Sequence, residues 1–455
     1  AGDREGEFTG LIADQLELAG KGSEAYKYLV KAGKEATAKY ANEEAIQFFN
    51  RALELLKVQP RSPERQSEEL EIQMALGPAL IATRGFGAKV VEHTYTRARE
   101  LARQAGQFEQ LFQATWGQWV HYNQIGDSIT AKKLKEHLFD QAKQSGDKSL
   151  LLEAHHSGWT TEWTLGNVSA VVEHTRNGME IYKPEMSQDH IRIYGHDPMG
   201  CALMMNARAL WKLGYPDQAE QRAIEGYALG MQLDHPFSSA VASWGIMDVK
   251  LLRGEIKEAA EKASEFEAFV KEQGFPLYIA MANTVQGALL VTQGKTAEGM
   301  AKIRDAQSMA ERIGALILMT WILCEFLEAC LETGEIEDGL KAVEHEMENH
   351  PITGQRWMES EIRRLYGELI LADDPGRVAE AEAEFHLAID MSQRQKAKSL
   401  ELRAVMSLAR LWQKQGKAKQ AHERLSEVYN WFTEGFDTKD LKEAKALLEQ
   451  LEKHY

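Results

Sequence analysis

Apolar residues recur at steps of three and four along most of the chain, the pattern of helices that bury one face. The segment from Leu277 to Gln293 shows this spacing clearly, and Gly294 then ends it. A glycine in that place is typical of a helix C-terminus, and the next helix is predicted to begin near Thr296. No strand-rich block interrupts the pattern, which therefore predicts helix, tight turn and helix in repeated units.

The turns of these units recur every 40 residues. Four turn glycines have this spacing, and each is followed five residues later by Ala or Gly: Gly214, Gly254, Gly294 and Gly334. The series extends back to Gly126 and Gly166 and forward to Asp374 and Gly416. A small residue after the turn lets the two helices of a hairpin approach closely. Because one hairpin cannot bury both its faces, the period predicts stacked hairpins in an all-α solenoid.

One interval in this series is longer than the rest. The step that ends at Gly214 has eight extra residues, which fall in the stretch 183–197. Pro184 and Pro198 interrupt helix there, so we expect a protruding loop. We also expect Asp197 to cap the helix that begins at Pro198.

The chain has 455 residues, enough for several globular domains, yet no linker rich in Pro, Gly or Ser divides it. We therefore predict one elongated domain over 1–455. Its last helix, Lys439 to Leu451, follows a non-helical corner and has a charged outer face, as the end of a solenoid requires. Thr438 or Asp437 is expected to cap that helix. The predicted parts are N-terminal helices at 8–66, repeats at 67–433 and a C-terminal capping helix at 434–455.

Composition restricts the class of partner. The net charge of −16 disfavours nucleic acid, because affinity for phosphates depends on concentrated Lys and Arg. Cys201, Cys324 and Cys330 lie in apolar stretches without CxxC spacing, which indicates reduced thiols in a cytoplasmic protein. The longest apolar run, 315–324, is too short to span a bilayer. We predict no nucleic acid and no membrane as partners.

Several stretches of the sequence resemble a known family. They are Thr83–Phe86, Tyr95–Ala98, Tyr194–Pro198, Ala209–Ala219, Arg403–Trp412 and Tyr429–Leu448. On these residues the chain is similar to the C-terminal tetratricopeptide-repeat region of bacterial signalling proteins that join an adenylate or guanylate cyclase domain to an AAA ATPase domain. The similarity extends over residues 8 to 453.

The resemblance implies a right-handed superhelix of about ten helical hairpins. It also implies a non-catalytic, cytoplasmic regulatory segment without cofactors, because the family's cyclase and ATPase domains lie outside this region. Its partner would be a protein, a peptide or a small ligand bound in the concave groove, with the attached domains receiving the signal. Two alternatives remain open, the sensor tail of a signalling-ATPase transcription regulator and a self-associating structural scaffold.

Alignment on the turn glycines implies which residues of each first helix line the groove. They are Trp116, Asn123, His156, Trp163, Met204, Arg208, Trp211, Trp244, Asp248, Trp321 and Glu328. Tryptophan and arginine dominate binding hot spots, and Arg208 is suited to a carboxylate, a phosphate or a peptide terminus. The alternative is that the tryptophans are core residues, since large aromatic side chains at helical spacing are usually interior.

Other motifs give no support for catalysis. The Gly-Lys-Thr sequence at 294–296 lacks the first glycine of a phosphate-binding loop, where Leu289 stands, and a helix precedes it in place of a strand. Adjacent residues His155 and His156 point about 100° apart on a helix, so they do not form the i, i+4 pair of zinc hydrolases. No nucleophile-and-base pattern occurs. The sequence therefore predicts no enzyme activity, no metal and no cofactor.

Overall fold

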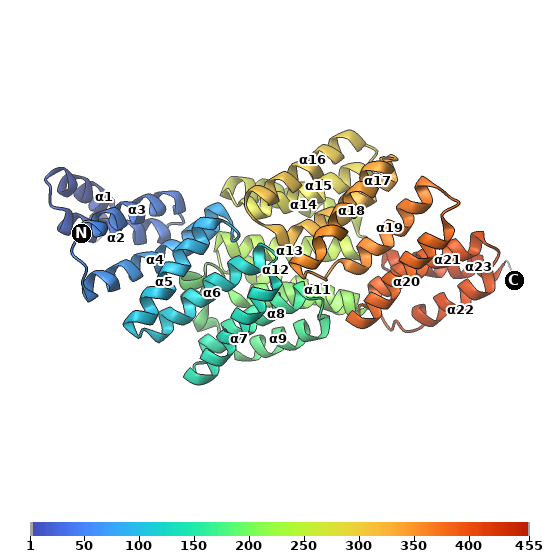
Figure 1. The fold of residues 1–455 in the computed structure, drawn as a ribbon, viewed down its shortest axis with the longest axis horizontal. Helices are drawn as coiled ribbons and strands as arrows, with labels where there is room; N and C mark the ends of the chain where they lie inside the picture. The colour runs from blue at the N-terminus through green and yellow to red at the C-terminus, as the bar shows by residue number, and fades with distance from the viewer. Residues whose placement is uncertain (1–2, 454–455) are drawn as a thin grey trace.

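The chain folds into paired α-helices, seen in a computed structural model that describes residues 3–453 (Figure 1). Within that range there is no β-strand, so the predicted all-α solenoid of stacked hairpins is confirmed. Residues 1–2 and 454–455 of the predicted domain lie outside the described residues. The helices are α1 Asp3–Leu18, α2 Gly22–Ala38, α3 Asn42–Lys57, α4 Pro63–Arg84, α5 Lys89–Ala105, α6 Phe108–Gln124, α7 Ser128–Ser145, α8 Lys148–Thr164, α9 Val168–Ile181, η1 Pro184–Met186, α10 Ser187–Tyr194, α11 Pro198–Leu213, α12 Pro216–Gln232, α13 Pro236–Arg253, α14 Ile256–Gln273, α15 Pro276–Thr292, α16 Thr296–Arg312, η2 Leu316–Leu318, α17 Met319–Thr333, α18 Ile336–Thr353, α19 Glu359–Asp373, α20 Val378–Gln395, α21 Lys398–Lys414, α22 Ala418–Tyr429 and α23 Lys439–Glu452.

The hairpin of α15 and α16 shows why the repeat needs small residues. Gly294 has φ +78°, a left-handed conformation that a glycine adopts without strain. Five residues later, Gly299 faces Gly287 of α15 so closely that a Cβ at Gly299 would lie 2.6 Å from the carbonyl oxygen of Gly287. The two backbones therefore touch directly. This close approach is what the small residue after each turn was expected to permit.

The long interval before α11 is not a protruding loop. The chain forms the short helix η1 and then α10, which packs against α4 and α6. The side chains of His190 and Tyr194 on α10 are 1% and 3% exposed. Burial of this apolar and aromatic face fixes the insertion against the core, and the expectation of a loop was wrong for that reason. The expected cap is present, with Asp197 accepting a hydrogen bond from the amide of Gly200 at 3.0 Å.

Successive turns of the solenoid contact each other end to end. The amide of Arg356 donates to the carbonyl oxygen of Thr164 at 2.7 Å, and the hydroxyl of Ser399 donates to the carbonyl oxygen of Trp211 at 2.6 Å. In each pair the C-terminal end of the first helix of a hairpin, α8 or α11, meets residues at or just before the start of the first helix of a later hairpin, α19 or α21. We call this line of contacts the seam.

The seam continues to the C-terminal cap. Asp217 at the start of α12 accepts a hydrogen bond from the amide of Gly435 at 3.0 Å, across 218 positions of sequence. Arg253 at the end of α13 reaches Asp437, just before α23, at 3.3 Å. The predicted last helix is present as α23. Thr438 occupies the N-cap position, but its hydroxyl donates to the carbonyl oxygen of Gly435 at 2.7 Å and does not cap the helix.

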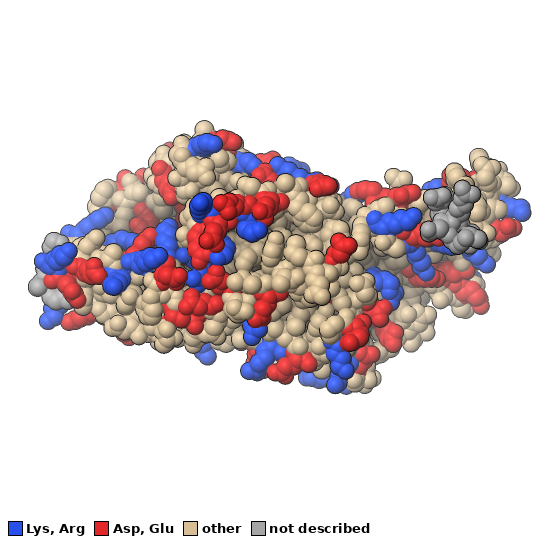
Figure 2. Space-filling model, turned by 180° about the vertical axis from the view of Figure 1, so that it is seen from behind, with Lys and Arg blue, Asp and Glu red and all other residues tan. Residues whose placement is uncertain are grey.

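Charged residues lie on the surface (Figure 2), and the three cysteines lie in the interior. Figure 2 shows acidic and basic side chains interspersed over one face, without a large basic patch on that face. Cys201, Cys324 and Cys330 are buried and unpaired. No helix within residues 3–453 combines the length and the apolar composition that crossing a bilayer requires.

Candidate functional site

The predicted groove residues all lie on the first helices of their hairpins, namely α6, α8, α11, α13 and α17. Their exposure differs widely. The five tryptophans among them are between 1% and 6% exposed, whereas the side chain of Glu328 is 50% exposed. Whether these residues bind a ligand stays a prediction. Their surroundings separate them into a dry aromatic part and an ionic part.

The dry part lies around α6 and the start of α11. Trp116 and His156 are in edge contact, with ring centroids 5.7 Å apart. Asn123 is 1% exposed, and neither its side-chain oxygen nor its nitrogen has a hydrogen-bond partner among the described residues. Met204 is half-buried and packs against Gly245 of α13.

Arg208 lies among three indole rings. Its guanidinium carbon is 4.6 Å from the ring centre of Trp163, 5.4 Å from that of Trp357 and 5.9 Å from that of Trp244. Its Nε lies 2.8 Å from an Oδ2 of Asp248, without the alignment of a hydrogen bond. The ring faces and the carboxylate together compensate a cation that has lost most of its water. Nε of Arg208 and Oδ2 of Asp248 therefore have no hydrogen-bond partner among the described residues.

Lys212, one helical turn after Arg208, occupies the same aromatic enclosure. Its Nζ is 4.5 Å from the ring centre of Trp163 and 5.2 Å from that of Trp357, and it donates a hydrogen bond to the carbonyl oxygen of Trp357. Burial, together with the neighbouring charge of Arg208, lowers the pKa of Lys212 to about 7. The hydrogen bond from the amino group of Lys212 therefore connects α11 to the seam, and this amino group titrates near neutral pH.

A second ionic group follows on α17, α19 and α21. Arg364 lies 2.7 Å from Glu361 and 3.2 Å from Glu328, and Arg403 lies 3.4 Å from Glu361 and 2.7 Å from Asp440. Burial alone would raise the pKa of Glu361, but Arg364 and Arg403 hold it at about 2. Arg403 also stacks over Trp211, 5.0 Å from its ring centre, so the groove residue Trp211 joins this group.

Two carboxyl groups form the accessible end of this arrangement. Trp321 donates a hydrogen bond from its indole nitrogen to Glu325 at 3.1 Å, and Glu328 stands one turn later on the same face of α17. Desolvation raises the pKa of Glu325, and the charge of Glu328 raises it further. The pKa of Glu328 is also raised by desolvation, although half of its side chain is accessible. A carboxyl group with both properties has protein on several sides and water on one.

We call this set of residues the inner strip. Its members are Trp163, Arg208, Lys212, Trp211, Trp244, Asp248, Trp321, Glu325, Glu328, Trp357, Glu361, Arg364 and Arg403. Sequence reasoning identified its first-helix tryptophans but missed Trp357, which lies between α18 and α19, outside the aligned positions. It also missed Glu325, although the spacing of three residues from Glu328 places both on one helix face.

Comparisons with known proteins support the fold class. No known family model matches the sequence. An uncharacterized protein of Rhizobium meliloti (strain 1021) is 24% identical over 413 residues, which are 89% of this chain and 39% of that protein. The chain thus spans about two fifths of the length of the curated relative that it matches.

Two solved structures share the architecture. A Rap protein complexed with competence and sporulation factor has a TM-score of 0.56 at 11% identity, covering 85% of this chain and 99% of that one. The Rap conjugation gene regulator of the plasmid pLS20, in complex with the Phr peptide, has a TM-score of 0.51 at 15% identity, covering 63% and 74%. At such identities the likeness concerns the fold, an α-solenoid of the tetratricopeptide-repeat kind.

Proposed function

We propose that this chain is a non-catalytic binding segment that takes up a peptide, or an extended segment of a protein, at the accessible end of the inner strip. The observation that carries the proposal is the pair Glu325 and Glu328. The two carboxyl groups stand three residues apart on one helix face, with Trp321 donating to Glu325 and Arg364 lying 3.2 Å from Glu328, and the exposed half of the Glu328 side chain is open to a further cationic group. A lysine or arginine side chain, or a peptide amino terminus, has the required chemistry.

The rest of the inner strip supports a peptide over a small solute. Arg364 of α19 lies 3.2 Å from Glu328, and Trp321 stands two helical turns before Glu328 on α17. Charged groups on two neighbouring helices offer hydrogen bonds to an extended chain that crosses both helices. Both Rap structures named above are complexes, one with competence and sporulation factor and one with the Phr peptide, which is in keeping with this proposal.

We further propose that occupancy is conveyed through the seam to attached domains. In a solenoid each repeat contacts its neighbours, so a small rotation per repeat accumulates along the molecule. Lys212 belongs both to the inner strip and to the seam, so a bound ligand would act on the contacts between turns of the solenoid through this residue. The sequence resemblance suggests that the attached domains are a nucleotide cyclase and an AAA ATPase, and the much longer relative fits a role within a larger protein.

Fluorescence anisotropy with labelled ten-residue peptides tests the binding proposal. Lys-rich, Glu-rich and Ser/Gly-only peptides are compared, and the Lys-rich peptide is expected to bind most tightly. Glu328→Gln is expected to weaken its binding by about tenfold, corresponding to about 1.4 kcal/mol. Because the chain carries a net charge of −16, non-specific attraction must be separated from binding at this pair.

Glu298→Gln provides that control. Glu298 is exposed on the outer helix α16, and its substitution removes the same charge at a distance from the inner strip. Equal weakening by Glu298→Gln and Glu328→Gln would contradict the proposal, as would equal binding of the three peptides. In the full-length protein, a cyclase or ATPase rate that does not respond to a bound peptide would contradict the coupling.

A further inference from the structure

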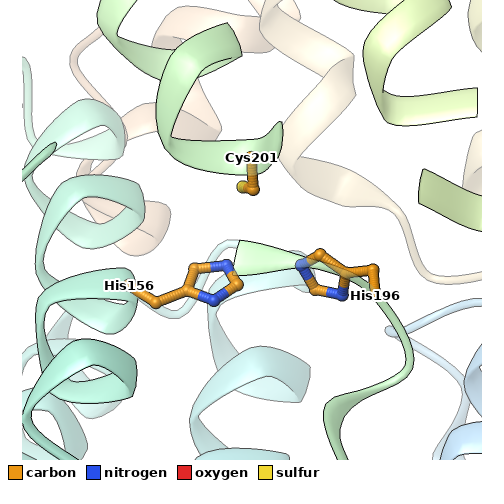
Figure 3. A group of neighbouring side chains, drawn as sticks. All are labelled: His156, His196 and Cys201. Atoms are coloured by element: carbon orange, nitrogen blue, oxygen red, sulfur yellow. The ribbon is translucent and has the colours of Figure 1, made fainter. Parts of the chain in front are cut away.

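Three side chains from separate elements meet in the interior beside the insertion. They are His156 of α8, His196 in the turn after α10, and Cys201 in the first turn of α11. One nitrogen of each imidazole and the sulfur lie within 4.8 Å of one another, and the residues are 4%, 6% and 9% exposed. Figure 3 shows the thiol and the two rings arranged around a common space.

A buried carboxylate orients the first of these ligands. Glu153, which is 0% exposed, lies with one oxygen 3.0 Å from Nδ1 of His156 and with the other 2.6 Å from Nδ1 of His190. The hydrogen bond to Glu153 requires the proton on Nδ1 of His156, so the lone pair of this ring is on Nε2. A histidine held in this way by a carboxylate is the usual support of a metal-bound imidazole.

One ring nitrogen of the second histidine, His196, lacks a hydrogen-bond partner. Within residues 3–453, Nδ1 of His196 is buried and has no hydrogen-bond partner. A buried polar atom without a partner costs stability, and its presence in a native fold calls for an explanation. Aromatic side chains line the space around the two rings. Trp116 lies 6.4 Å and Phe237 5.9 Å from His196 between ring centres, and Trp159 stacks on His156 at 4.8 Å.

We propose that His156, His196 and Cys201 bind one Zn²⁺ ion. Two imidazole nitrogens and a thiolate suit a borderline ion such as zinc, whereas Mg²⁺ and Ca²⁺ prefer oxygen ligands. Three protein ligands leave one position of a tetrahedral zinc ion for water. Glu153 is the positioning residue that fixes the tautomer of His156.

The ion would stabilise the fold beside the insertion, where the 40-residue period is interrupted. His196 stands at the end of the insertion and Cys201 directly after it, and His156 belongs to the preceding hairpin. Metal binding would therefore cross-link α8 to the start of α11 and hold α10 against the core. Since zinc binds this arrangement only in the folded state, it should raise the melting temperature. This site is separate from the inner strip, so the two proposals stand or fall independently.

Metal analysis and cobalt substitution test the site. Protein purified after growth with zinc is expected to contain one zinc per chain by elemental analysis. Protein from metal-limited growth, titrated with Co²⁺, is expected to develop a thiolate-to-cobalt charge-transfer band at one equivalent. Cys201→Ser should abolish this band and weaken Zn²⁺ binding by about 100-fold, and Glu153→Gln should weaken it by about 10-fold.

Cys324→Ser is the matched control, because Cys324 is also a buried free thiol but lies on α17, away from the two histidines. It should keep the band and the stoichiometry. Circular dichroism establishes that each variant is folded. Should Cys201→Ser not fold, X-ray absorption on the zinc-loaded wild type decides, with one sulfur and two imidazole ligands expected. Folded wild type without stoichiometric Zn²⁺ or Co²⁺ uptake, or a band that survives Cys201→Ser, would overturn the proposal.

Discussion

The ammonium group of Lys212 donates a hydrogen bond to the main-chain oxygen of Trp357, 145 positions later in the chain. This contact joins the last turn of α11 to the residues that precede α19, and it lies inside the aromatic enclosure that also holds Arg208. A residue of the inner strip is thereby also a residue of the seam. We therefore expect a change in the charge of Lys212 to change the free energy of unfolding of the whole solenoid.

Lys212 predicts a specific dependence of stability on pH. Its pKa is about 7 in the folded chain and ordinarily about 10.4 in an unfolded one. Between these values the unfolded state binds more protons, so the free energy of unfolding should rise with pH, by up to about 1.4 kcal/mol per unit. Urea unfolding at pH 7 to 10 measures this slope. Lys212→Met should flatten it, and substitution of the exposed Lys257 by Met should leave it in place.

Gly87, before α5, and Gly314, before η2, form a further long-range contact of the seam, where added volume is expected to lower stability. A Cβ at Gly87 would lie 2.0 Å from the carbonyl oxygen of Gly314, which belongs to the backbone and has no easy way to yield. Gly87→Ala should therefore cost about 1–3 kcal/mol of stability, seen as a lower melting temperature. Gly200→Ala is the comparison, since a Cβ at that helical position meets nothing within 4 Å. Equal effects of the two changes would count against a close-packed seam.

Arg208 and Asp248 predict a strong non-additivity. Asp248→Asn leaves the buried guanidinium without its counter-ion and should lower the free energy of unfolding by about 3–5 kcal/mol. The double change Arg208→Met with Asp248→Leu removes both charges and should cost less than Asp248→Asn alone. Chemical unfolding of Arg208→Met, Asp248→Leu and the double variant measures the coupling. Additive losses would mean that the ion pair contributes nothing.

Arg253 predicts that the C-terminal cap depends on the seam. Its side chain is 4% exposed and lies 2.8 Å from Asp217 and 3.3 Å from Asp437. Arg253→Met should raise hydrogen exchange in α23 while leaving α1 to α9 unchanged, because its partners Asp217 and Asp437 lie at the start of α12 and just before α23 and none of its ion pairs within residues 3–453 reaches α1 to α9. Arg304→Met, which removes an arginine with 48% exposed side chain from α16, should have little effect. Exchange unchanged in α23 would show that the cap is held by its own packing.

The peptide and zinc proposals relate differently to the sequence. Glu328 was already a groove candidate, because the alignment of turn glycines reaches every first helix. The sequence predicts no metal, because His155 and His156 point apart on one helix and the other histidines, His196 among them, are scattered along the chain. The structure brings His156 instead to His196 and Cys201, which stand 40 and 45 positions away. No spacing rule for ligands on one helix identifies such a set.

The sequence by itself determined the local units of this protein. The glycine at 294 and the small residue at 299 encode a turn and a close crossing, because both requirements are met by neighbours within one hairpin. Only the tertiary structure decided that the insertion forms α10 and that Lys212 meets Trp357. Those contacts depend on small rotations summed over many stacked repeats, which no single repeat of the sequence specifies.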